Sequence, residues 1–179
     1  FAFHHLENMM TQSNHDHQSV RSKEQKNSRS NSTETKIIEE RRAKAEEMRA
    51  QGQNPFANDF KVTHVASQLA SQFAEFSTEE LDQSIKEGQA VTFSIAGRLM
   101  AKRSFGKVAF GSLRDRSGDL QLSFFKLELS TEIWSSMKKS DLGDIIGCEG
   151  MMMRTQKGEL SLKVTHFRVL TKSLRPLPD

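Results

Sequence analysis

The spacing of apolar residues changes after Gly88, and this change limits the folds open to the chain. Before Gly88, apolar residues recur every three or four positions, as on the buried side of a helix. From residue 91 onward they recur every second position, since Val91, Phe93, Ile95 and the following residues alternate with polar or small ones. This alternation predicts a long strand and places a β domain in the C-terminal half.

Four more strands and one helix are predicted after this first strand. The strands are expected at residues 108–113, 120–125, 144–155 and 159–170, and the helix at 128–139. Five strands with a helix between the third and fourth are typical of an OB-fold barrel, which binds oligonucleotides on its second and third strands. The strands contain Gly97, Gly111, Gly147 and Gly150, which suit the sharp coiling of a small barrel. Another small antiparallel barrel or sandwich is the alternative.

The fold class is therefore mainly β with helices, and the barrel is preceded by N-terminal helices and a tail. Residues 1–36 are polar and lack apolar periodicity, so we expect them to be disordered. Helices are predicted at 37–51, at 62–75 and after the capping box at Ser77, and they form a helical lead-in at 37–88. The barrel is expected at 89–172, and residues 173–179 are expected to begin a linker.

Composition argues against a catalytic, membrane or metal-binding role for these residues. No apolar run approaches the roughly 20 residues that span a bilayer, and the single Cys148 cannot form an internal disulfide, so we expect a cytoplasmic protein. No phosphate-binding loop, nucleophile motif or paired cysteine ligands occur. Four of the six histidines lie in the polar tail without a folded frame, so no metal site is expected.

Charge and aromatic residues instead favour nucleic-acid binding. Residues 91–172 hold 14 Lys and Arg against 8 Asp and Glu, which is a net charge of +6. Since the whole chain has a net charge of +3, the remaining residues have a net charge of −3. Segment 97–110 combines basic residues with two phenylalanines around a predicted turn, namely Arg98, Lys102, Arg103, Lys107, Phe105 and Phe110. Single-stranded RNA is bound by stacking on aromatics while cations meet phosphates. For Phe110 the alternative is an ordinary residue of the hydrophobic core. Gln121 lies between Leu120 and Leu122 and is therefore expected to point outward.

Several phrases of the sequence resemble one family, the class II lysyl-tRNA synthetases. Gly97-Arg98 with residues 106–110 is similar to the family's first barrel hairpin. The family's entry is matched by Arg41 to Lys44, Arg49 to Phe56 and Asn58 to Phe60. The most specific match is Asp141 to Gly147 with Gly150, followed by Thr155 to Ser161 and by the closing phrase Leu170 to Pro178. The resemblance covers residues 37–179 and leaves the tail unexplained.

The resemblance implies that the barrel recognises the anticodon of a lysine tRNA. Phe110 resembles the aromatic residue that stacks on the central uridine of the anticodon. Gln121 resembles the polar residue that recognises the edge of that base, and Arg103 resembles the basic residue that supports the same base. Glu159 resembles the acidic member of the site, and Arg98, Lys102 and Lys107 are expected to meet phosphates. Aspartyl and asparaginyl relatives share the Arg–Phe–Gln spacing, while Gly158 to Ser161 and Leu170 to Lys172 favour lysyl. Phe105 departs from the family, which usually keeps a smaller or aliphatic residue there.

The resemblance also implies a larger parent enzyme. That parent would ligate lysine to its tRNA as a homodimer, using ATP and Mg in a catalytic domain beyond Asp179. The chain by itself lacks the three class II motifs, so we expect it to bind no cofactor and to be catalytically inactive. A stand-alone OB-fold module for single-stranded RNA or for protein interaction is the alternative.

Overall fold

A computed structural model of the chain describes residues 32–177. Most of the tail expected at 1–36 lies outside these residues. The chain divides into two compact units, Phe1–Glu40 and Arg41–Asp179. In the first unit residues 32–40 are helical, so the predicted start of the helix at residue 37 is wrong. Residues 32–36 contain no Gly or Pro, and Lys36 is spaced four residues from Glu40, which favours an earlier start.

The second unit contains three short helices after the helical residues 41–50. They are α2 (Ala66–Gln72), α3 (Thr78–Lys86) and α4 (Thr131–Lys139). The capping box at Ser77 is confirmed, since its side chain accepts from the Glu80 amide and the Glu80 carboxylate accepts from the Ser77 amide. Helix α4 begins three residues later than predicted, because Ser130 caps it by accepting from the Ile133 amide.

Helix α2 is shorter than the predicted helix at 62–75, for a reason visible in its neighbours. The Thr63 amide and hydroxyl both donate to the Ser94 carbonyl, and the Thr63 hydroxyl accepts from the Ser94 amide. These bonds hold the chain at Thr63 beside the first strand and outside the helix. The helix then starts where the Asp115 carboxylate accepts from the Ala66 amide, at 2.7 Å.

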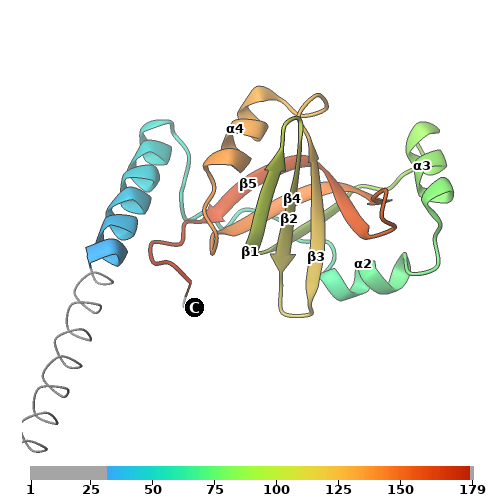
Figure 1. The fold of residues 1–179 in the computed structure, drawn as a ribbon, viewed down its shortest axis with the longest axis horizontal. Helices are drawn as coiled ribbons and strands as arrows, with labels where there is room; N and C mark the ends of the chain where they lie inside the picture. The colour runs from blue at the N-terminus through green and yellow to red at the C-terminus, as the bar shows by residue number, and fades with distance from the viewer. Residues whose placement is uncertain (1–31, 178–179) are drawn as a thin grey trace, which may run out of the picture. The chain divides into compact units, whose positions relative to one another are not determined.

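Five strands close into a barrel in the order β1-β2-β3-β5-β4. They are β1 (Phe93–Phe105), β2 (Val108–Arg114), β3 (Asp119–Phe125), β4 (Ile145–Arg154) and β5 (Leu160–Thr171). All neighbours are antiparallel except β3 and β5. In Figure 1, α4 lies on one side of the barrel, and α2 and α3 lie on the other. The five-stranded OB fold with one helix between the third and fourth strands is confirmed.

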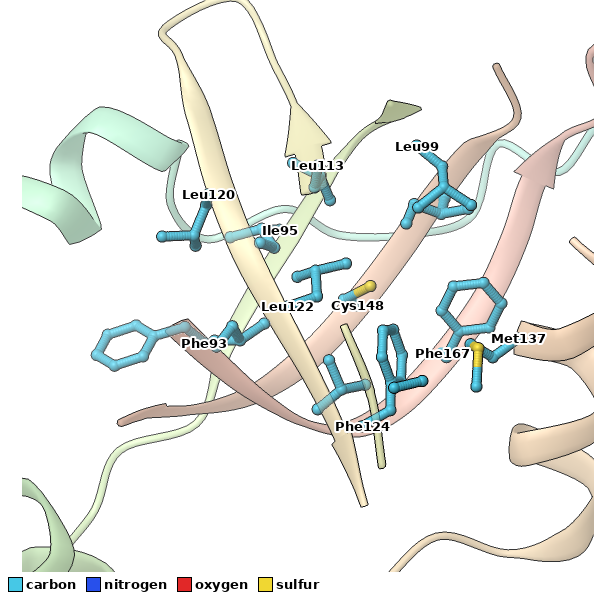
Figure 2. Close-up of a cluster of buried hydrophobic side chains, with 14 of the residues drawn as sticks. Phe93, Ile95, Leu99, Leu113, Leu120, Leu122, Phe124, Met137, Cys148 and Phe167 are labelled. Carbon is cyan, nitrogen blue, oxygen red and sulfur yellow. The ribbon is translucent and has the colours of Figure 1, made fainter. Parts of the chain in front are cut away.

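The barrel interior is filled by the alternating apolar residues of its strands (Figure 2). Leu120, Leu122 and Phe124 of β3 are all buried, as their spacing predicts. The Phe124 and Phe167 rings meet edge to face, with centroids 5.7 Å apart. Because these residues point inward, residues 121, 123 and 125 point to the outer side of β3, where Gln121 and Phe125 are half-buried and Ser123 is fully buried.

Two glycines inside the strands permit backbone approaches that any side chain would block. A Cβ on Gly150 would lie 2.1 Å from the Lys163 carbonyl oxygen, where the β4–β5 register shifts. A Cβ on Gly97 would lie 2.6 Å from the Arg114 carbonyl oxygen. A side chain is therefore excluded at both positions, and at Gly150 the close approach coincides with an irregularity in the strand pairing.

Candidate nucleic-acid interface

The orientation of Phe110, left open by the sequence, follows from its neighbours on β2. Ala109, Gly111 and Leu113 are buried inside the barrel. The residues between them, Phe110 and Ser112, therefore stand on the outer surface. Phe110 is half-buried there rather than enclosed in the core.

The β1–β2 hairpin places a basic residue directly beside this aromatic ring. Arg103 is the cross-strand partner of Phe110, and Phe105 is the partner of Val108. Partners in an antiparallel pair carry side chains on the same face, so all four residues share the outer surface. The Phe105 and Phe110 ring centroids lie 6.3 Å apart, and their planes are tilted by 56°.

Strand β3 brings Gln121 to the next position on the same face. Gln121 pairs with Ser112 on β2, while Ser123 pairs with Phe110. Gln121 is half-buried and points outward, as predicted from its position between Leu120 and Leu122. Its side chain offers both a donor and an acceptor to a ligand on this surface.

The buried hydroxyls of Ser123 and Ser161 fix the backbone under this face. Their oxygens lie 2.7 Å apart across the parallel β3–β5 pair. The Ser161 hydroxyl also lies within hydrogen-bond distance of the Gln121 carbonyl oxygen, at 3.2 Å. The Gln121 backbone is thus held in place by the pairing of β3 with β5, which fixes the point on the surface from which its side chain projects.

Glu159 lies at the edge of this surface, in the turn that precedes β5. It is exposed, and its backbone is fixed by the Thr155 amide, which donates to its carbonyl, and by the Thr155 hydroxyl, which accepts from its amide. Gly158 before it has a φ of 80°, the left-handed region in which glycine is favoured. Since Ser161 pairs with Gln121, Glu159 continues the β5 edge beyond the row that holds Gln121.

Two of the four predicted RNA-binding cations are available to a ligand. Arg103 and Lys107 are exposed, and within residues 32–177 their side chains make no hydrogen bond or ion pair. The sequence analysis did not identify Lys163, the partner of Ser123 on β5, but this cation is engaged within the fold: its ammonium lies 5.5 Å from the centroid of the Phe125 ring and pairs with Glu128 at 2.7 Å. The alternation along β3 could have predicted that Phe125 lies on the same side as Gln121, but only the pairing of β3 with β5 places Lys163 beside it.

The other two predicted cations have partners within the fold. Lys102 pairs with Gly111 and so lies on the inner side of β1, where its ammonium donates to the Met137, Lys138 and Ser140 carbonyls at the end of α4. Burial lowers the pKa of Lys102, an effect that the charge of Asp141 partly offsets. Arg98 donates to the Gly143 carbonyl at 2.8 Å. The structure therefore groups Arg103, Phe110 and Gln121, and directs Lys102 and Arg98 toward α4 and the α4–β4 connection.

Neither a membrane-spanning helix nor a metal-binding cluster is present among residues 32–177. No helix in this part of the chain is long and apolar enough to cross a membrane. The same residues hold no group of three His, Cys, Asp or Glu side chains placed to bind a metal ion. Cys148 is a free thiol buried in the barrel.

Comparison with known proteins agrees with this geometry. Residues 93–170 match the tRNA anticodon family, described as an OB-fold nucleic-acid-binding domain. The chain is 45% identical to the lysine–tRNA ligase of Pediococcus pentosaceus over 139 residues, and 45% identical to that of Cupriavidus necator over 146 residues. These alignments cover 78% and 82% of the chain but 27% of each relative, so the chain spans about a quarter of their length. The chain thus carries an anticodon-binding OB domain homologous to the N-terminal part of lysine–tRNA ligases.

Proposed function

We propose that the outer face of β1, β2 and β3 binds the anticodon loop of a lysine tRNA and that Phe110 stacks on its central base. The observation that carries this proposal is the direct pairing of Arg103 with Phe110, one row from Gln121. An aromatic face binds a base by stacking, and a free guanidinium beside it neutralises the adjoining phosphates or contacts the base.

The polar residues of this face supply the recognition. Gln121 can donate to a base carbonyl and accept from a base N–H, which together read the edge of a uridine. Glu159 accepts an N–H at the border of the same surface. Lys107 and Arg103 provide the charge, so binding weakens as salt concentration rises. Lys102 and Arg98 act indirectly in this proposal, by holding the hairpin against α4 and the loop that follows it.

The parent protein is proposed to be a class II lysine–tRNA ligase that acts as a homodimer. Its ATP and Mg would bind in a catalytic domain rather than to the residues described above. The 179-residue chain is then expected to give no lysine-dependent exchange between ATP and pyrophosphate. Exchange at a rate comparable to a complete ligase would contradict this part of the proposal.

Replacement of Phe110 by Ala tests the anticodon site. Loss of base stacking is expected to weaken binding of a lysine-tRNA anticodon stem-loop by about 1–3 kcal/mol, measured by fluorescence anisotropy. Phe56→Ala is the matched control, because Phe56 is also an exposed aromatic but lies by the Thr171 end of β5. Equal binding by the Phe110 variant and the wild type would refute the site.

A further inference from the structure

Phe105 leaves most of its ring in water at the end of the β1–β2 hairpin. Phe105 is 63% exposed, whereas Phe110 on the neighbouring strand is half-buried. A fully buried phenylalanine contributes about 1.5–3 kcal/mol, so an exposed one gives up much of that stabilisation. The barrel core therefore does not account for an aromatic residue at this position.

The surroundings of Phe105 are those of a nucleotide-binding position. Arg103 stands two residues before it on the same face of β1, and Lys107 follows it in the hairpin turn. Both cations are exposed and, in the described part of the chain, neither is paired with an acid. A base on the Phe105 ring would thus have a cation on each side for its flanking phosphates.

The geometry of the two rings determines how many bases the face can hold. The Phe105 and Phe110 centroids are 6.3 Å apart and the ring planes are inclined by 56°, so one flat base cannot stack on both. Neighbouring bases in a stacked strand are separated by about 3.4 Å. Two bases on these two rings must be unstacked from each other, which is how single-stranded RNA loops are presented to proteins.

We infer that Phe105 is a second stacking surface, which binds the base adjoining the one on Phe110. This inference rests on the proposed function and extends it from one base to two consecutive bases of the same single strand. Arg103 and Lys107 neutralise the phosphates on either side of the second nucleotide. The hairpin end is thereby assigned a role in RNA affinity that the barrel core does not require.

Three substitutions separate stacking on RNA from packing within the hairpin. Phe105→Ala removes both, Phe105→Leu keeps apolar contact with Phe110 but offers no aromatic face, and Phe105→Trp keeps the aromatic face. The 179-residue chain would be titrated with a labelled lysine-tRNA anticodon stem-loop. The Ala and Leu variants are expected to bind about 5- to 100-fold more weakly, and the Trp variant as tightly as the wild type. Wild-type affinity in the Leu variant would overturn the inference.

Abasic nucleotides identify the base that contacts each ring. Each anticodon position of the stem-loop would be made abasic in turn and titrated against the wild type, Phe105→Ala and Phe110→Ala. Phe110→Ala should no longer weaken binding when the central base is absent. Phe105→Ala should no longer weaken binding when one neighbouring base is absent. Phe56→Ala serves as the control, and its effect on binding should not depend on which anticodon base is absent.

The outcomes keep the two claims apart. If Phe110→Ala couples to the central base while Phe105→Ala couples to no position, the inference about Phe105 fails and the proposed function stands. If Phe105→Ala couples to the central base, the assignment of two separate bases is wrong. If neither variant weakens binding, both claims fail together.

Discussion

The buried ion-pair network around Lys172 gives a prediction about stability that can be worked from the structure. The Lys172 ammonium lies 2.7 Å from the nearer carboxylate oxygen of Asp144 and also pairs with Asp141. The Lys172 and Asp144 side chains are 2% and 0% exposed. Lys172→Met keeps most of the apolar stem but removes the charge, and so leaves the Asp144 carboxylate buried without a cation.

The expected loss follows from what Asp144 and Asp141 retain. Removing one partner of a buried pair costs about 3–5 kcal/mol. Asp144 would still accept from the Asp141 and Ser173 amides, at 2.8 and 2.9 Å. Asp141 would still pair with Lys44 at 2.6 Å. The lower end of the range, about 3 kcal/mol, is therefore expected, which corresponds to a fall of about 6–12 °C in Tm.

Urea unfolding followed by the fluorescence of Trp134 measures this loss. Trp134 is the chain's single tryptophan and is buried in α4, so its emission reports on the packing of α4 in the fold. The double variant Lys172→Met with Asp144→Asn should recover part of the loss, because it removes the unpaired charge as well. A Lys172→Met variant within about 1 kcal/mol of the wild type would refute the reasoning.

Three further outcomes follow from the same structure. Gly150→Ala should lower the free energy of unfolding in urea by about 1–3 kcal/mol. Gly111→Ala should lower it by less, because the added Cβ would come no closer than 3.4 Å to its neighbours. Equal losses for the two variants would contradict the close approach at Gly150. Burial raises the pKa of the Cys148 thiol, so a thiol reagent should modify it only after unfolding, and rapid modification of the folded chain would contradict its burial. Burial works to raise the pKa of Asp141, but hydrogen bonds from Lys172 and Lys44 hold it below its usual 3.8. The stability this carboxylate gives is therefore present above that pH and lost as pH falls through its folded pKa; Asp141→Asn should reduce the acid sensitivity of Tm, and an unchanged pH profile would argue against the pairing.

Much of the fold could be predicted because local patterns and burial agree. In β3 the alternation of Leu120, Leu122 and Phe124 predicts the inward face, and these side chains are buried. The capping box at Ser77 predicts the start of α3 for the same reason, since its bonds are local. Other boundaries depend on tertiary contacts. The hydrogen bonds between Thr63 and Ser94 shorten α2, and a local sequence pattern cannot predict bonds between residues so far apart in the chain.

The candidate site was less predictable, because it depends on register. Strand β1 is continuous from Phe93 to Phe105, but its register with β2 is irregular between Leu99 and Ala101. Beyond this irregularity, Arg103 stands on the outer face and Lys102 on the inner one, where α4 ends. The sequence alone could not assign Lys102 to a helix end 35 residues away in the chain. The pairing of Arg103 with Phe110 likewise emerges only from the strand register.

The preference of the chain for the central anticodon base tests the central claim most directly. Dissociation constants would be measured for the wild type and Gln121→Ala, with a lysine-tRNA anticodon stem-loop and with the same loop carrying cytidine at the central position. The wild type is expected to bind the uridine loop about tenfold more tightly, because a mismatched edge leaves a polar group unpaired, and Gln121→Ala should reduce this difference. Equal binding of the two loops by the wild type would contradict anticodon recognition by this face.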